Sequence, residues 1–106
     1  ARFTRANLNE AQLSFATLIG SHFEWATLSH SRLALADLRL ADLDRTIATF
    51  ASFEAARMNF VTARGADLRG ARFNRSDLED ADLRGSALGG ASFRGAKLED
   101  AQGIEN

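Results

Sequence analysis

Few residues of this chain have the chemistry or the spacing to support catalysis or to hold a metal ion. Its only histidines, His22 and His30, are eight residues apart and have no cysteine or convergent pair of carboxylates to complete a site. The absence of cysteine excludes thiolate zinc sites, disulfides and cysteine nucleophiles. Serines and threonines form no Ser–His–Asp arrangement, and no Gly-rich phosphate loop is present. We therefore expect no catalytic residue, metal site or cofactor, and predict that the protein is not an enzyme.

A five-residue repeat runs through the whole chain. In blocks of five from Ala1, the third position is Leu in 12 of 21 blocks, Phe in 5 and Met in one, and the first position is Ala in 15. On an α-helix a step of five residues advances about 500°, so the large residues would spread around the helix. On a flat strand successive large residues would point to opposite faces. Every fifth residue can share one interior only if the chain turns a corner once per repeat, which predicts an all-β solenoid.

Two blocks lack the large residue at the third position. Ala48 and Ala63 stand there, and the first positions of the same blocks hold the β-branched residues Thr46 and Val61. A filled interior requires such a shift of volume between the two inward positions. We expect one solenoid domain over the whole chain, residues 1–106, with any irregularity at residues 46–65.

The number of repeats per coil follows from the ladders that each choice would create. Residues stacked on neighbouring coils lie about 4.8 Å apart, so charges in register should alternate in sign. A spacing of 20 residues produces the charge ladder Asp37, Arg57, Asp77 and Lys97 and the core stack Phe53, Phe73 and Phe93. It also places Trp25 between Arg5 and Arg45, within reach of cation–π contact. A spacing of 15 residues brings Asp67 next to Asp82. We therefore predict four repeats per coil and about five coils.

The repeat resembles that of the pentapeptide repeat family, whose pattern is A(D/N)LXX. The blocks ADLRG at 66–70 and 81–85 match it fully, and the resemblance covers essentially the whole chain. It implies a right-handed quadrilateral β-helix with four repeats per coil, in agreement with the ladders. The aspartates at its second position are Asp37, Asp42, Asp67, Asp77 and Asp82. We expect them to bond nearby backbone amides rather than to act as acids.

The outward-pointing fifth position differs between the two halves of the chain. From residue 61 onward it holds glycine or a charged residue. Between residues 11 and 60 it holds six large apolar residues, which are Phe15, Trp25, Leu35, Leu40, Phe50 and Phe60. The stacked pairs Phe15–Leu35 and Leu40–Phe60 are expected on different faces, which spreads the apolar surface around the rod. Exposed apolar clusters mark contact surfaces; the alternative is that these side chains only cover the backbone at corners.

One acidic cluster is expected towards the C-terminal end. It consists of Glu79, Asp80, Glu99 and Asp100, which the 20-residue spacing stacks on two adjacent coils. Four carboxylates could bind a cation weakly. The favoured interpretation is an exposed acidic face neutralised by arginine or solvent.

The leading functional hypothesis is a rigid, non-catalytic protein–protein interaction module or spacer, which binds a protein partner or a second copy of itself. The alternative comes from the resemblance: some pentapeptide repeat proteins resemble B-form DNA, bind type II topoisomerases and confer quinolone resistance. Those proteins are strongly acidic, whereas this chain has a net charge of −1. Its arginines at 57, 64, 69, 72, 75, 84 and 94 would spoil a surface that imitates phosphates.

Charge and hydropathy also bear on location. Near-neutral charge predicts no direct binding to nucleic acid. No apolar run approaches the length of a membrane span or of a signal peptide, so we expect no membrane contact and a cytoplasmic protein.

The chain begins with Ala1, and we expect it to belong to a longer protein. The exposed strand edges at the solenoid ends would then be capped by further residues, by end-to-end association or by a partner.

Overall fold

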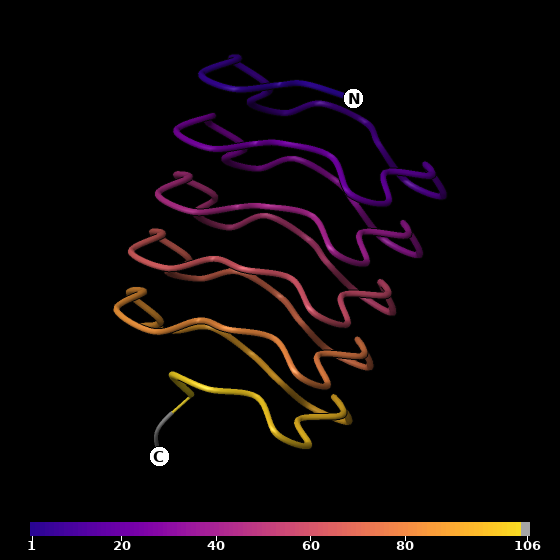
Figure 1. The fold of residues 1–106 in the computed structure, drawn as a ribbon, viewed down its shortest axis with the longest axis vertical. Coiled ribbons are helices and arrows are strands. Elements are labelled where there is room, and N and C mark those ends of the chain that lie inside the picture. The colour runs from indigo at the N-terminus through magenta and orange to yellow at the C-terminus, as the bar shows by residue number, and fades with distance from the viewer. Residues whose placement is uncertain (105–106) are drawn as a thin grey trace.

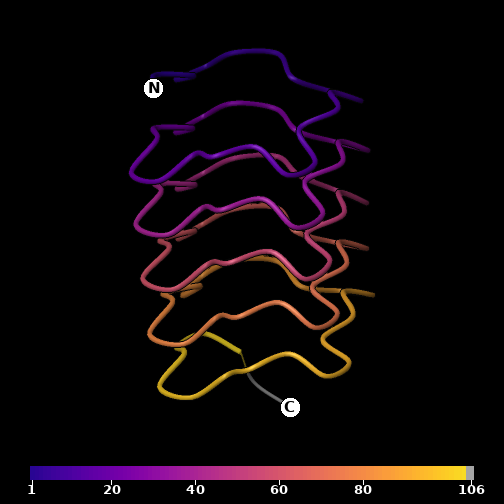
Figure 2. The same cartoon turned by 90° about the vertical axis from the view of Figure 1, so that its right-hand side faces the viewer.

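The chain is wound into a stack of coils. The computed structural model describes residues 1–104, and its longest dimension is 31 Å against 23 and 20 Å across. The first and the last described coils lie at opposite ends of the stack (Figures 1 and 2). No α-helix lies in residues 1–104, so this part of the chain also contains no helix that could cross a membrane.

Extended structure is limited to isolated parallel bridges, one in each pentapeptide, at the second position. Every bridge joins residues twenty apart, from Arg2–His22 to Asp82–Gln102. Four pentapeptides therefore complete one coil. The bridges also align the predicted ladder from Asp37 to Lys97.

The four sides of each coil are named here by where their pentapeptides begin. Face 1 begins at residue 1, face 2 at residue 6, face 3 at residue 11 and face 4 at residue 16, and each recurs every twenty residues. Each face ends in a turn, and the corner formed there takes the number of that face. Coil 1 is residues 1–20, coil 2 is 21–40, coil 3 is 41–60, coil 4 is 61–80 and coil 5 is 81–100.

Each corner is a hydrogen-bonded turn of a single kind. The N–H of Ala6 donates to the carbonyl of Phe3 at 2.9 Å, and this bond recurs between the first and third positions along the described chain. The fifth residue of the pentapeptide has a φ near +60°, whereas the fourth does not have a positive φ, which defines a type II turn. Between coils, the N–H of Phe3 donates to the carbonyl of His22, so backbone groups are satisfied along the stack.

The interior is filled by the third-position side chains, and each coil contributes one phenylalanine. These residues are Phe3, Phe23, Phe53, Phe73 and Phe93. The first two lie on face 1 and stack with ring centroids 4.9 Å apart. The other three lie on face 3 and stack at 5.0 Å. The aromatic column therefore changes from one side of the interior to the opposite side between coils 2 and 3.

Residues 46–65 are regular, so the expectation of an irregularity there is wrong. They keep the same bridge and turn as their neighbours. Ala48 and Ala63 are buried, while Ile47 and Phe50 point outward and are exposed. The two alanines occur in coils 3 and 4, directly after the aromatic column changes sides. Thr46 and Val61, the larger first-position residues of the same blocks, are buried as well, so the missing volume is supplied at the other inward position and the backbone need not deform.

Candidate interaction surface

The turn geometry places every fifth-position side chain outside the coil. Phe15 has a φ of 67°, Trp25 of 63° and Phe60 of 63°. Such values suit glycine, because an L-residue in this region brings its Cβ close to the backbone at a cost of about 1 kcal/mol. The chain nevertheless carries large apolar residues there in coils 1 to 3.

All six predicted contact residues are exposed. Between 52% and 73% of the surface of each one is accessible, and they are Phe15, Trp25, Leu35, Leu40, Phe50 and Phe60. In coils 4 and 5 the same position holds glycine or a charged residue. One half of the rod therefore presents bulky apolar groups at strained positions, and the other half does not.

Four of these residues lie along the two edges of a single face. Phe15 and Leu35 are at corner 3, and Leu40 and Phe60 are at corner 4. Corners 3 and 4 are the two ends of face 4, so the expected spread around the rod is wrong for these pairs. Ile19, also exposed, extends the row at corner 4. We call these five residues with the part of face 4 between them the apolar-edged face.

The middle of the apolar-edged face is polar. Its second positions hold Thr17, Asp37 and Arg57, which bridge one another along the stack. Asp37 is held by Arg39 of its own coil, with Nη2 and Oδ2 2.7 Å apart. A partner on this face would therefore meet two apolar rims with a charged strip between them.

Trp25 lies apart from this face, at corner 1. The guanidinium carbons of Arg5 and Arg45 lie 5.5 and 5.4 Å from its ring centroid, as expected for cation–π contact. Trp25 therefore has partners within its own chain on both sides. For Trp25 this supports the alternative that the large outward side chains cover the backbone at the corners.

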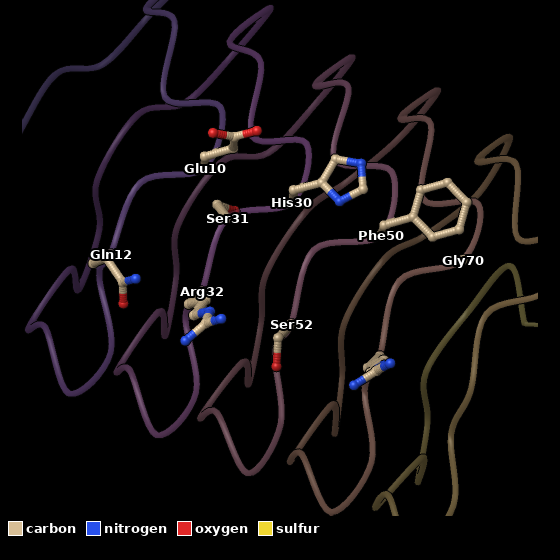
Figure 3. A pocket seen from close by; sticks show the side chains of 9 residues that line it. Glu10, Gln12, His30, Ser31, Arg32, Phe50, Ser52 and Gly70 are labelled. Carbon is tan, nitrogen blue, oxygen red and sulfur yellow. The ribbon is translucent and has the colours of Figure 1, made fainter.

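Phe50 also has a partner of its own chain, and it borders a shallow groove. Its ring stacks on the imidazole of His30 with centroids 5.3 Å apart. Figure 3 shows Glu10, His30, Phe50 and Gly70 in a row along corner 2, with a second, polar row beside it on face 3. The residues of the second row are Gln12, Arg32, Ser52 and Arg72. The groove is open and polar, and we assign no reaction to it.

The second-position aspartates bond to backbone amides, as the repeat predicts. Asp42 Oδ1 accepts the N–H of Asp44 at 2.9 Å, and four other aspartates accept bonds from the residue two positions on. The blocks that continue with arginine add an ion pair that the sequence analysis missed. Arg84, for example, donates through Nε and Nη2 to Asp82 at 2.8 and 2.7 Å. Asp37–Arg39 and Asp67–Arg69 repeat this geometry.

These ion pairs shift the acidity of their aspartates. Hydrogen bonds from the arginine side chain lower the pKa of Asp37, Asp67 and Asp82, although partial burial opposes the shift. Arg64 pairs in the same way with Asp44, from one coil to the next. Within residues 1–104, four aspartates are therefore paired with an arginine.

The predicted acidic cluster lacks such pairing. The carboxylate of Asp77 is the first cause of a raised pKa at Glu79, followed by burial and by Glu99. Within residues 1–104, this cluster does not bring three carboxylates to metal-binding distance. A different group does meet that criterion, on face 1.

His22 has two carboxylate neighbours, so the prediction that no carboxylates converge on it is wrong. Its Nδ1 lies 3.2 Å from Oε2 of Glu24, and Asp42 is bridged to it from the next coil. Burial raises the pKa of Asp42, and the carboxylates of Asp44 and Glu24 act in the same direction. The 20-residue period places Asp42 next to His22, so the sequence could have indicated this group. The sequence analysis assigned Asp42 only a hydrogen bond to the backbone.

Four-sided coils that are joined to one another by isolated parallel bridges define a β-solenoid repeat protein. The chain belongs to the pentapeptide repeat family: the family model "Pentapeptide repeats" matches eight copies, over residues 1–24, 21–59, 36–75 and 64–100. The fold is accordingly the right-handed quadrilateral β-helix of that family.

Solved structures of the family show the same fold. The pentapeptide repeat protein Rfr23 from the cyanobacterium Cyanothece 51142 matches with a TM-score of 0.82 and 24% identity over 85% of this chain. The match covers 62% of that protein, so this chain spans about three fifths of its length. The protein alr5209 from Nostoc PCC 7120 matches with a TM-score of 0.51 and 25% identity, over 88% of this chain and 84% of that one. No curated protein sequence matches the chain.

Proposed function

We propose that this solenoid is a rigid, non-catalytic protein-interaction module, which binds a protein partner or a second copy of itself through the apolar-edged face. The observation that carries the proposal is the occupancy of the turn positions. Phe15, Leu35, Leu40 and Phe60 are large, exposed and held at positive φ, where coils 4 and 5 use glycine or a charged residue. Strained positions that carry exposed apolar groups are typical of functional sites.

The shape of the site supports protein recognition over small-molecule chemistry. The rims of the apolar-edged face are separated by a charged strip, and an apolar groove lies on its corner 4 rim between Leu40 and Phe60. Interfaces between proteins combine apolar contacts with polar groups in this way. The interior of the coil is filled by side chains, which leaves no enclosed cavity for a substrate there.

The pattern of charges favours this proposal over imitation of DNA. A surface that imitates DNA needs unpaired negative charge, because it must replace phosphates. Asp37, Asp44, Asp67 and Asp82 are each paired with an arginine. Inhibition of gyrase supercoiling by micromolar protein would favour the alternative.

The test uses substitutions that the turn geometry tolerates. The triple variant Phe15→Gly, Leu40→Gly, Phe60→Gly removes the side chains from positions whose φ suits glycine. Arg75→Gly is the matched control, since Arg75 has the same turn conformation at corner 3 but carries no apolar group. Self-association is measured by sedimentation equilibrium, and partner binding by retention of a specific protein on the immobilised solenoid.

We expect wild type and Arg75→Gly to bind equally and the triple variant to lose binding. Circular dichroism must show the triple variant folded for the result to count. If wild type and the folded triple variant behave identically in both assays, the proposal is wrong.

A further inference from the structure

The group of His22, Glu24 and Asp42 on face 1 has the composition of a metal site. Each residue offers one ligand atom, and these atoms all lie within 4.8 Å of one another. His22 and Asp42 are bridged partners on coils 2 and 3. Glu24 follows His22 by two residues and bonds to its imidazole. The three side chains therefore converge from two adjacent coils.

The hydrogen bonds of the two carboxylates leave an acceptor atom free. Asp42 uses Oδ1 to accept the N–H of Asp44, and its carboxylate lies beside that of Glu24. Glu24 uses Oε2 towards His22, while its Oε1 is buried as an atom and has no hydrogen-bond partner within the described chain. A buried carboxylate oxygen without a partner is costly, because nothing replaces the water that it has lost.

No neighbouring cation of the described chain is paired with these carboxylates. Arg2, the bridged partner of His22 on coil 1, forms no ion pair with Glu24 or Asp42 within residues 1–104. Arg64 pairs with Asp44, and Arg5 and Arg45 lie against the ring of Trp25. Within residues 1–104, neither Glu24 nor Asp42 forms an ion pair with lysine or arginine. Within residues 1–104 the imidazole of His22 is thus the one basic group paired with these carboxylates, and a cation would satisfy all three.

The ligand set selects the class of ion. One imidazole nitrogen with two carboxylate oxygens suits a divalent transition metal such as Zn²⁺, which commonly takes three protein ligands and completes its coordination with water. Mg²⁺ and Ca²⁺ favour ligand sets made of oxygen alone. We propose that His22, Glu24 and Asp42 form a zinc-type site that ties coil 2 to coil 3.

Thermal unfolding of the untagged protein tests the proposal, with ZnCl2 and MgCl2 as probes. Because the ligands come from two coils of the folded state, Zn²⁺ should raise the Tm. The expected rise is about 10 °C when free Zn²⁺ is a hundred times its dissociation constant. MgCl2 at the same concentration should leave the Tm unchanged. The shift should vanish in His22→Ala and in Asp42→Asn, and isothermal titration calorimetry should show no heat of binding for either.

Matched controls come from the same chain. His30→Ala removes the other histidine, which stacks on Phe50. Asp82→Asn removes an aspartate at the same position of face 1 that is paired with Arg84. Both controls should retain the response to Zn²⁺.

A spectroscopic readout separates the site from a general effect on stability. The chain has two histidines, so a ¹⁵N-resolved NMR spectrum of the imidazoles contains two rings. Zn²⁺ should shift the His22 signals and leave those of His30 in place. The proposal is overturned if wild type shows neither a Tm shift nor heat of binding up to millimolar Zn²⁺. It is equally overturned if folded His22→Ala responds as wild type does.

Discussion

The ring of Phe50 lies over the backbone of Gly70, so close that a Cβ atom on Gly70 would be 2.6 Å from two ring carbons. These residues occupy the same corner on successive coils, and the other neighbour of the ring is His30. A side chain that is exposed to solvent is therefore positioned by a glycine twenty residues later. Phe50 and Gly70 both line the groove in Figure 3.

This relationship predicts a difference between two glycine substitutions. Gly70→Ala and Gly20→Ala both place a Cβ at positive φ, with φ values of 71° and 68°. No atom lies within 4 Å of a Cβ on Gly20, whereas Gly70→Ala must shift the Phe50 ring, which stacks on His30. We expect Gly70→Ala to lower the free energy of unfolding by about 1 kcal/mol more than Gly20→Ala, as urea unfolding would measure.

The double variant isolates the cause. In the Phe50→Ala background the two glycine substitutions should cost the same, because the ring is gone. A difference that persists there would mean that Gly70 is sensitive for a reason other than Phe50.

The aromatic column predicts a strongly destabilising substitution. Phe73 is fully buried and stacks on Phe53 and on Phe93. Phe73→Ala should lower the free energy of unfolding by about 3–5 kcal/mol, because it leaves a cavity with rings on both sides. Phe93→Ala should cost less, since Phe93 is only partly buried. Equal losses would contradict this account of the column.

The turn conformation predicts that an exposed apolar residue can be removed without loss of stability. Leu40 has a φ of 65° and is exposed, so Leu40→Gly relieves strain and uncovers little apolar surface. The free energy of unfolding should change by no more than about 1 kcal/mol, and towards greater stability. Leu38→Gly, two residues earlier and buried, should unfold the protein or cost several times as much. A large loss from Leu40→Gly would show that this side chain serves the fold.

The shifted carboxyl groups predict how stability depends on pH. The pKa of Asp82 is lowered from its ordinary value of 3.8 by Arg84, so its ion pair stabilises the fold above that value. This contribution is lost as the pH falls through the lowered pKa. Asp82→Asn should therefore be less stable than wild type at pH 7, and the difference should shrink as the pH falls below 3.8. Urea midpoints measured across this range provide the comparison.

Glu79 should show the opposite dependence. Its pKa is raised above 4.5, mainly by Asp77, so the folded state binds the proton more tightly than the unfolded chain does. Protonation thus favours the fold as the pH falls through the raised pKa. Glu79→Gln should be more stable than wild type at pH 7, and this advantage should disappear below about pH 4. A constant advantage at all pH values would mean that charge repulsion is not its source.

The periodicity of the sequence predicted the parts of the molecule that depend on the backbone alone. The 20-residue spacing that aligns Asp37 with Arg57 is the spacing of the bridges, and it brings Trp25 between two arginines. The period assigns each residue to a face and a coil, so the sequence alone predicts which residues are neighbours on adjacent coils. The position of the apolar-edged face was also accessible in principle, but the two corners were treated as separate faces.

The remaining features depend on how side chains turn, which the period does not determine. Asp82 could meet a charge on the next coil or Arg84 on its own, and it bonds Arg84 because the two side chains point to the same side of the chain. The imidazole of His22 meets Glu24 for the same reason. The expected irregularity failed for a different reason, since the volume missing at Ala63 is supplied within its own block by the buried Val61.

The uniform pairing of residues twenty apart has a consequence for insertions and deletions. Excision of residues 61–80 would bring Phe53 against Phe93 and Leu43 against Leu83, pairs that the interior already accommodates elsewhere. A cut of five, ten or fifteen residues within coil 4 would instead shift every later block to another face and move Phe93 out of line with Phe53. A solenoid of this kind can therefore gain or lose whole coils while its cross-section stays constant. Its length can then change independently of the side chains on its surface.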